Sequence, residues 1–113
     1  MHEMSLAESV QQIIEEHART EGFSRVLAVR LEIGMLAGVE PEALRFCFEA
    51  AMLGSMAEGA RLEIVETPGS GWCRRCDVTV PMAERYSACP HCGGYELQPN
   101  GGTEMRITEL EVK

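Results

Sequence analysis

Two Cys-x-x-Cys pairs are the feature that most constrains how this chain can fold. Cys73 and Cys76 form the first pair, Cys89 and Cys92 form the second, and residues 77–88 separate them. Four thiolates at this spacing can surround one tetrahedral zinc ion. Two disulfides or a redox dithiol are the alternatives, but we expect no secretory signal peptide and find no βαβ pattern of a thioredoxin-like site. The spacing therefore predicts a zinc site.

A zinc ion with four cysteine ligands keeps no open coordination position for water or substrate. We therefore expect this ion to support structure, and the function to lie elsewhere in the chain. Pro90 and Gly93 favour the tight turn around the second pair. His91 lies inside that pair, and three interpretations stay open for it: a solvated turn residue, a group just outside the ligand shell, and a labile metal ligand.

Charge and length exclude several classes of function. The 113 residues have a formal net charge of −8, and a zinc ion held by four thiolates contributes a further charge of about −2. Nucleic-acid binding requires a basic patch that neutralises phosphates, and the arginines here are scattered, so we expect no nucleic-acid partner. No apolar run is long enough to span a bilayer. We expect a small cytoplasmic protein with one domain and at most a satellite.

Hydrophobic periodicity predicts helices and strands before the first cysteine pair. The predicted elements are a helix over about residues 4–21, a strand over 26–33, a helix from Pro41 to before Gly54, and a strand over 60–66. Proline suits the first position of a helix, and glycine commonly follows the last one. Cys47 falls on the apolar face of the second helix, where we expect a buried core thiol.

Two joints rich in glycine and proline bracket the cysteine pairs, at residues 68–71 and 99–102. Residues 68–102 are therefore predicted to form a zinc-binding module that needs the metal, because so short a segment buries too little apolar surface. Residues 103–113 predict a final strand that returns to the domain begun by residues 1–67. The expected fold class is α+β, with two helices on a three-stranded sheet and an inserted, zinc-ribbon-like module.

The amino terminus has a specific metal-binding property. The α-amine of Met1, the backbone nitrogen of His2 and the imidazole Nδ1 of His2 form two fused chelate rings, and the amide nitrogen of Glu3 completes a planar set of four nitrogens. Square-planar nitrogen ligation with deprotonated amides favours Ni(II) or Cu(II) over zinc, magnesium or calcium. On composition alone, an accidental histidine at a frayed chain end is the alternative.

Several stretches, in order, resemble one known family. They are the opening MHEMSL, the segment EEHA, then VRLEIGMLAGVEPEALRFCFE and GARLEIVETPG, the two CxxC pairs and the closing GTEMRITELEV. Together they resemble the HypA/HybF family of hydrogenase maturation factors over essentially the whole chain. The resemblance implies a nickel metallochaperone, which is not an enzyme. Such a protein binds Ni(II) as cargo at its amino terminus and, with a nickel-dependent GTPase, delivers it to the large subunit of NiFe-hydrogenase; in some bacteria it also serves urease maturation.

The resemblance assigns roles to individual residues. Met1, His2 and Glu3 are implied nickel ligands. Glu40 matches an acidic position that the resemblance implies as an additional group of the nickel site, as a ligand or just outside the ligand shell, although helix entry also explains an acid there. The implied structural zinc ligands are Cys73, Cys76, Cys89 and Cys92. The chain lacks the histidines that flank the CxxC pairs in several relatives, so a coupling between zinc ligation and nickel affinity is not carried over. A zinc-ribbon adaptor and a thiol redox switch are rival functions, but neither gives His2 a role.

Overall fold

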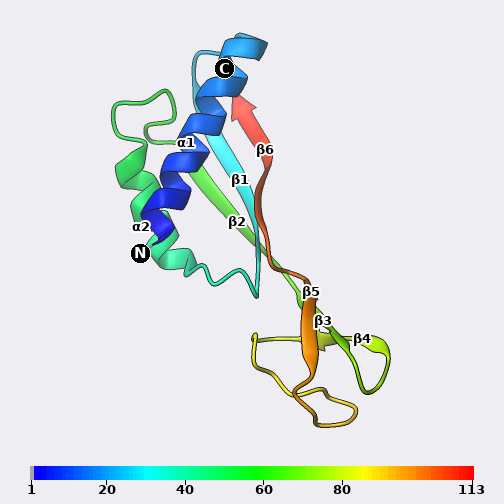
Figure 1. Cartoon of the computed structure of the whole chain (residues 1–113). Coiled ribbons are helices and arrows are strands. Elements are labelled where there is room, and N and C mark those ends of the chain that lie inside the picture. The colour runs from blue at the N-terminus through cyan, green and yellow to red at the C-terminus, as the bar shows by residue number, and fades with distance from the viewer. Residues whose placement is uncertain (1) are drawn as a thin grey trace. The chain divides into compact units, whose positions relative to one another are not determined.

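A computed structural model describes residues 2–113 of the chain and has an α+β fold, as the sequence predicts (Figure 1). The elements, in order, are α1 (His2–Glu21), β1 (Val26–Gly34), α2 (Pro41–Ala51), β2 (Arg61–Thr67), β3 (Gly69–Cys73), β4 (Val78–Met82), β5 (Leu97–Gly101) and β6 (Met105–Val112). The strands form two three-stranded sheets, with the orders β2-β1-β6 and β4-β3-β5. The first sheet is the predicted one, and the second was not predicted.

The chain forms two compact units. The helical unit comprises the chain up to Leu31, residues 39–64 and residues 107–113, and the cysteine unit comprises residues 32–38 and 65–106. Each unit therefore contains segments that are distant in the sequence. The last strand, β6, pairs in the same sheet as β1 and β2.

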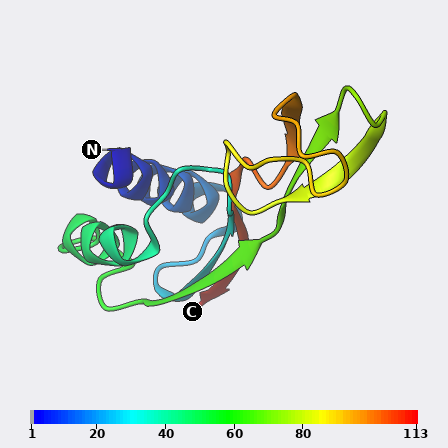
Figure 2. The same ribbon diagram turned by 90° about the horizontal axis from the view of Figure 1, so that it is seen from below.

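The core of the helical unit lies between the two helices and the sheet. Both helices lie on the same side of the sheet, and they pack against each other (Figures 1 and 2). α1 buries residues at helical spacing, namely Ala7, Val10, Ile14 and Ala18. α2 buries Leu44, Cys47 and Phe48, and β1 contributes Val29 and Leu31. Cys47 is thus the buried core thiol that the sequence predicts.

The start of α2 is defined by its local sequence. Pro41 occupies the first turn, where its missing N–H would have no helical acceptor. Glu40 precedes it in an extended conformation, and its side chain accepts a hydrogen bond from the backbone N–H of Glu42 at 3.3 Å. Glu40 is therefore the N-cap of α2. The regular helix ends at Ala51, and turns continue from there to Gly59.

The sheet of the cysteine unit is built around β3. This strand pairs antiparallel with β4 and with β5, so that Gly71 lies opposite Val80 on one side and Pro99 on the other. A Cβ at Gly71 would overlap the Sδ of Met82, so a larger residue there would require the Met82 side chain to move. The second sheet escaped prediction because its strands are short and two of the five residues of β3 are glycines, which leave no hydrophobic alternation to detect.

Candidate metal centres

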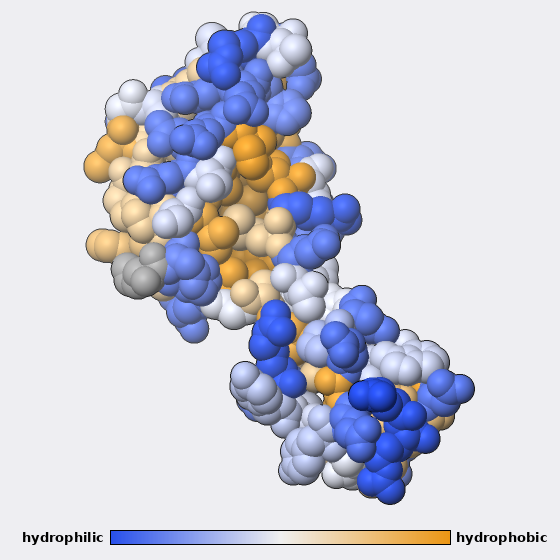
Figure 3. All heavy atoms as spheres, viewed as in Figure 1, coloured by the Kyte–Doolittle hydropathy of each residue, from blue (hydrophilic) through white to orange (hydrophobic). Residues whose placement is uncertain are grey.

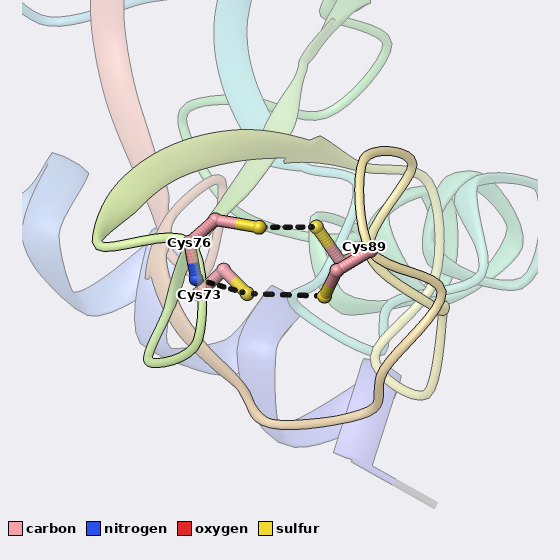
Figure 4. Close-up of side chains that lie close together, drawn as sticks. Cys73, Cys76 and Cys89 are labelled. Atoms are coloured by element: carbon pink, nitrogen blue, oxygen red, sulfur yellow. Dashed lines mark hydrogen bonds between the residues drawn. The ribbon is translucent and has the colours of Figure 1, made fainter.

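The four CxxC cysteines converge in the cysteine unit. One ligand atom from each, the Sγ, lies within 4.8 Å of those of the other three. Cys73 Sγ is 3.8 Å from Cys92 Sγ, and Cys76 Sγ is 3.9 Å from Cys89 Sγ (Figure 4). A zinc ion with tetrahedral bonds of about 2.3 Å to sulfur would place neighbouring sulfurs about 3.8 Å apart. The arrangement is a four-cysteine metal site of the kind that suits zinc.

The same distances exclude disulfide bonds in this structure. A disulfide requires two sulfurs about 2.05 Å apart, and all five cysteines are free. The site is also enclosed, since Cys73 and Cys89 are buried and pack with Val80, and Leu97 borders them. Cys76 and Cys92 are half-buried and pack against this cluster. Four cysteine ligands leave no open coordination position, which is the form expected of a structural site.

Two similar turns present the sulfurs. The residue after each CxxC pair, Asp77 in one turn and Gly93 in the other, has a left-handed backbone, with φ of 57° and 71°. Asp77 N–H donates to the carbonyl of Cys73, and Gly93 N–H donates to the carbonyl of Cys89, both at 2.8 Å. Each turn therefore closes around its first cysteine in the same way. The glycines after Cys92 predicted such a turn, and the equivalent turn at Asp77 had no signal in the sequence.

Backbone N–H groups also point at the sulfurs. Cys76 N–H donates to Cys73 Sγ, and His91 N–H donates to Cys89 Sγ, both at 3.4 Å. Among residues 2–113, the group able to hold a metal consists of the four cysteines and does not include the His91 imidazole. Of the three interpretations of His91, the structure supports an exposed turn residue that contributes through its backbone.

The thiols differ in acidity. The backbone N–H of Cys92, followed by that of His91, lowers the pKa of the Cys89 thiol to about 6. The neighbouring thiol of Cys92 and desolvation raise the pKa of Cys76 to about 12. Without a cation, the surroundings therefore favour the thiolate of Cys89 and oppose that of Cys76. A divalent cation supplies the positive charge that lets the remaining protons leave.

The second candidate centre lies at the start of α1. The side chain of His2 is 54% exposed, and its Nε2 lies 3.5 Å from Oε2 of Glu3. Glu3 is the only charged residue in the buried class among those that the structure describes. Its Oε2 accepts a hydrogen bond from the backbone N–H of Glu40 at 3.2 Å, and this bond is the main cause that lowers the pKa of Glu3. Met1, the remaining implied ligand, lies outside the described residues.

The structure thus brings His2, Glu3 and Glu40 together, but not as three side chains around one point. The Glu3 carboxylate contacts the backbone of Glu40, while the Glu40 carboxylate is engaged with the N–H of Glu42. This agrees with the helix-entry explanation of Glu40. The burial of Glu3 was missed, since nothing in the sequence separates it from the other acidic residues of α1.

The fold is a small α+β fold, and it carries a four-cysteine metal site and a second polar centre at its amino terminus. These features are those of a metal-binding protein of low molecular mass. Residues 1–112 match the family described as "Hydrogenase/urease nickel incorporation, metallochaperone, hypA". The chain is 60% identical to the hydrogenase maturation factor HypA of Dechloromonas aromatica and 61% identical to that of Albidiferax ferrireducens, with all of each chain covered.

A solved structure gives the same assignment. The solution structure of the nickel metallochaperone HypA from Helicobacter pylori matches with a TM-score of 0.72 and 28% identity, covering 99% of this chain and 97% of that one. The chain therefore belongs to the HypA family of hydrogenase maturation nickel metallochaperones, a family of proteins that are not enzymes. Within the part that the structure describes, no helix is both long and apolar enough to cross a membrane.

Proposed function

We propose that this protein binds Ni(II) through Met1, His2 and Glu3 and, together with a nickel-dependent GTPase, delivers it to the large subunit of NiFe-hydrogenase. Membership of the HypA family over residues 1–112 is the observation that carries this proposal. The similar curated proteins are hydrogenase maturation factors, which favours hydrogenase over urease as the client. We place this transfer in the cytoplasm, as the HypA family implies.

The start of α1 at His2 supports ligation by backbone amides. The first N–H groups of a helix have no intrahelical acceptor, so His2 and Glu3 can give up their amide protons without loss of a helical hydrogen bond. The His2 Nε2 faces the Glu3 carboxylate at 3.5 Å. A carboxylate in this position favours the tautomer with the proton on Nε2, and this tautomer leaves the lone pair on Nδ1, the nitrogen that closes the chelate ring.

Glu3 is proposed to contribute its amide nitrogen to nickel and its carboxylate to structure. The carboxylate is buried and bonded to Glu40 N–H, so its use as a metal ligand would break that contact. Glu40 is proposed to act on the site through this hydrogen bond and not as a ligand. Its own carboxylate caps α2.

Zinc is proposed to bind Cys73, Cys76, Cys89 and Cys92 and to stabilise the cysteine unit. The sulfur separations of 3.8 and 3.9 Å support this assignment. Since the four thiolates fill a tetrahedral shell, this ion would neither exchange with the nickel cargo nor activate water. The two metals would therefore have separate roles.

Calorimetric titration of untagged, zinc-loaded protein with Ni(II) tests the proposal, repeated in the presence of the GTPase. We expect one equivalent of nickel to bind with no loss of zinc, and nickel to reach the hydrogenase precursor only from the loaded protein. Protein that holds a full equivalent of zinc but binds no nickel would instead favour the zinc-adaptor function.

A further inference from the structure

Helix α2 is apolar on two sides. Its inner side is buried in the core, but Phe46 and Leu53, seven residues apart, are 74% and 68% exposed. Ala50 lies between them and is also exposed. Phe46 and Ala50, four residues apart, share one face of α2, and Leu53 lies in the turns that directly follow the helix. Figure 3 shows apolar surface over α2 and the turns that follow it. A helix with apolar residues on both sides commonly packs against something on both sides.

A hollow of about 280 Å³ runs beside this row of residues. Its lining includes the apolar residues Phe48, Met52, Ala57 and Leu62, together with Arg45 and Glu49. Arg45, Glu49 and Met52 line the hollow and each directly precedes a residue of the exposed row, so the hollow lies on the neighbouring side of the helix, about 100° around its axis. An exposed ridge with a hollow beside it offers the shape into which the side chains of a second helix can pack.

The charges around this face select the kind of partner. Exposed carboxylates are contributed by Glu42, Glu49 and Glu58. Arg45 is the basic residue that lines the hollow, and its guanidinium donates a hydrogen bond of 2.8 Å to the carbonyl of Leu62. A second guanidinium, that of Arg25, donates to the carbonyl of Glu58 at 3.0 Å, so three carboxylates stand against two guanidinium groups, in a chain whose formal net charge is −8. A second copy of this chain would bring like charges together, whereas lysines and arginines flanking an apolar stripe would complement the face.

The same helix leads to the proposed nickel site. α2 begins at Pro41, directly after Glu40, whose N–H is bonded to Glu3. Phe46 follows five residues later, which is about 7.5 Å along the helix axis. A partner seated on Phe46 would therefore lie within reach of the amino terminus.

We propose that the outer surface formed by Phe46 and Ala50 of α2, by Leu53 of the turn that follows and by the adjoining hollow docks an amphipathic helix of a nickel-handling protein. The docked helix would have an apolar stripe flanked by basic residues. This inference rests on the proposed function, because it assumes that nickel at the amino terminus passes to or from a protein partner. Docking would hold that partner beside the metal during transfer.

A double variant, Phe46→Ser with Leu53→Ser, tests this surface. Dissociation constants would be measured by interferometry for the GTPase and, separately, for the hydrogenase large-subunit precursor. We expect affinity for at least one of them to fall by about tenfold or more. The control is Tyr86→Ser with Tyr95→Ser, which removes two aromatic residues that are 89% and 75% exposed in the cysteine unit and should leave both affinities unchanged. Glu49→Lys should also weaken binding, with a smaller dependence on salt.

Nickel titration of the same samples separates the two hypotheses. If the wild-type protein binds no Ni(II), the proposed function fails. If it binds Ni(II) but the double variant binds both partners within about twofold of wild type, only the docking inference fails. Light scattering completes the test, since a wild-type dimer that the double variant converts to a monomer would make a second copy the occupant and would also overturn the inference.

Discussion

The backbone N–H of Glu40 donates a hydrogen bond to Oε2 of Glu3 across 3.2 Å. This contact joins the first turn of α1 to the entry of α2, although the two residues are far apart in the sequence. It buries a carboxylate directly beside the residue whose imidazole is proposed to hold nickel. Changes at Glu3 should therefore affect both the stability of the helical unit and the geometry of the amino terminus.

Replacing Glu3 separates these two effects. Glu3→Gln keeps an oxygen that can accept from Glu40 N–H, whereas Glu3→Ala leaves that donor without a partner, so we expect the melting temperature to fall more for alanine. The pKa of Glu3 is lowered in the folded protein, so the ionised carboxylate stabilises the fold above the unfolded pKa, and this contribution is lost as pH falls through the folded pKa.

Thermal melts over a pH series measure this contribution. The difference between wild type and Glu3→Gln should be largest near neutral pH and should shrink in acid. Glu8→Gln, at an exposed position of the same helix, is the matched control and should show no such pH dependence. A pH-independent difference for Glu3→Gln would mean that the charge of Glu3 has no part in the contact with Glu40.

Nickel affinity should depend on a free amino terminus. One residue added before Met1 moves the α-amine out of the chelate, and His2→Ala removes the imidazole, so each change should weaken Ni(II) binding by at least about tenfold. Protons on the amine and imidazole must leave, so affinity should also fall as the pH drops below about 6.5. Titration calorimetry provides the measurement, with His17→Ala as the control, since that histidine pairs with Glu21 at 3.1 Å. Unchanged affinity in the extended protein would exclude the amino-terminal chelate.

The sequence specified the helices and the first sheet well because those elements have strong local signals. The predicted helix over residues 4–21 is found at His2–Glu21, and Pro41 begins α2 as predicted. The four cysteines were found from spacing alone. By contrast, the contact of Glu3 with Glu40 depends on how α1 packs against α2, and no local pattern encodes such a long-range contact. The exposure of Phe46 was also not predicted, because hydrophobicity alone does not distinguish a core residue from an interface residue.

The left-handed backbone at Asp77 gives a prediction for the first cysteine turn. Asp77 occupies the position that Gly93 occupies in the second turn, and a β-branched side chain is strongly disfavoured there. Asp77→Val should therefore destabilise the zinc-loaded cysteine unit by about 1–2 kcal/mol, whereas Asp77→Gly should be close to neutral. Resistance to thermal unfolding and to a zinc chelator measures the effect. Equal stability of the valine and glycine variants would show that the turn can adopt another conformation.

Loss of one zinc ligand should disorder the cysteine unit and spare the helical unit. Cys73→Ser and Cys92→Ser should each lose stoichiometric zinc, because a hydroxyl is a poor replacement for a thiolate. Amide spectra should then lose the dispersed signals of about residues 69–102 while those of α1 and α2 persist. Cys47→Ser, at a buried thiol of the helical unit, is the control and should retain its zinc. Collapse of the whole spectrum with the zinc would instead show that the first sheet depends on residues 68–102.

Nickel and zinc should sort between the two sites by coordination geometry. Zinc is a d¹⁰ ion with no preference for a planar arrangement, so it gains little from deprotonated amides and should stay with the thiolates, whereas Ni(II) favours a plane of four nitrogens. Protein that already holds one zinc should therefore take up Ni(II) and show the yellow, low-spin spectrum of a square-planar complex. It should retain its zinc, and excess zinc should not displace the nickel.

A paramagnetic six-coordinate nickel would instead indicate side chains and water as ligands. It would then require the Glu3 carboxylate to leave Glu40 N–H, a rearrangement that amide spectra would detect at residue 40. Nickel that enters only by expelling zinc from Cys73, Cys76, Cys89 and Cys92 would contradict the assignment of two separate metal sites.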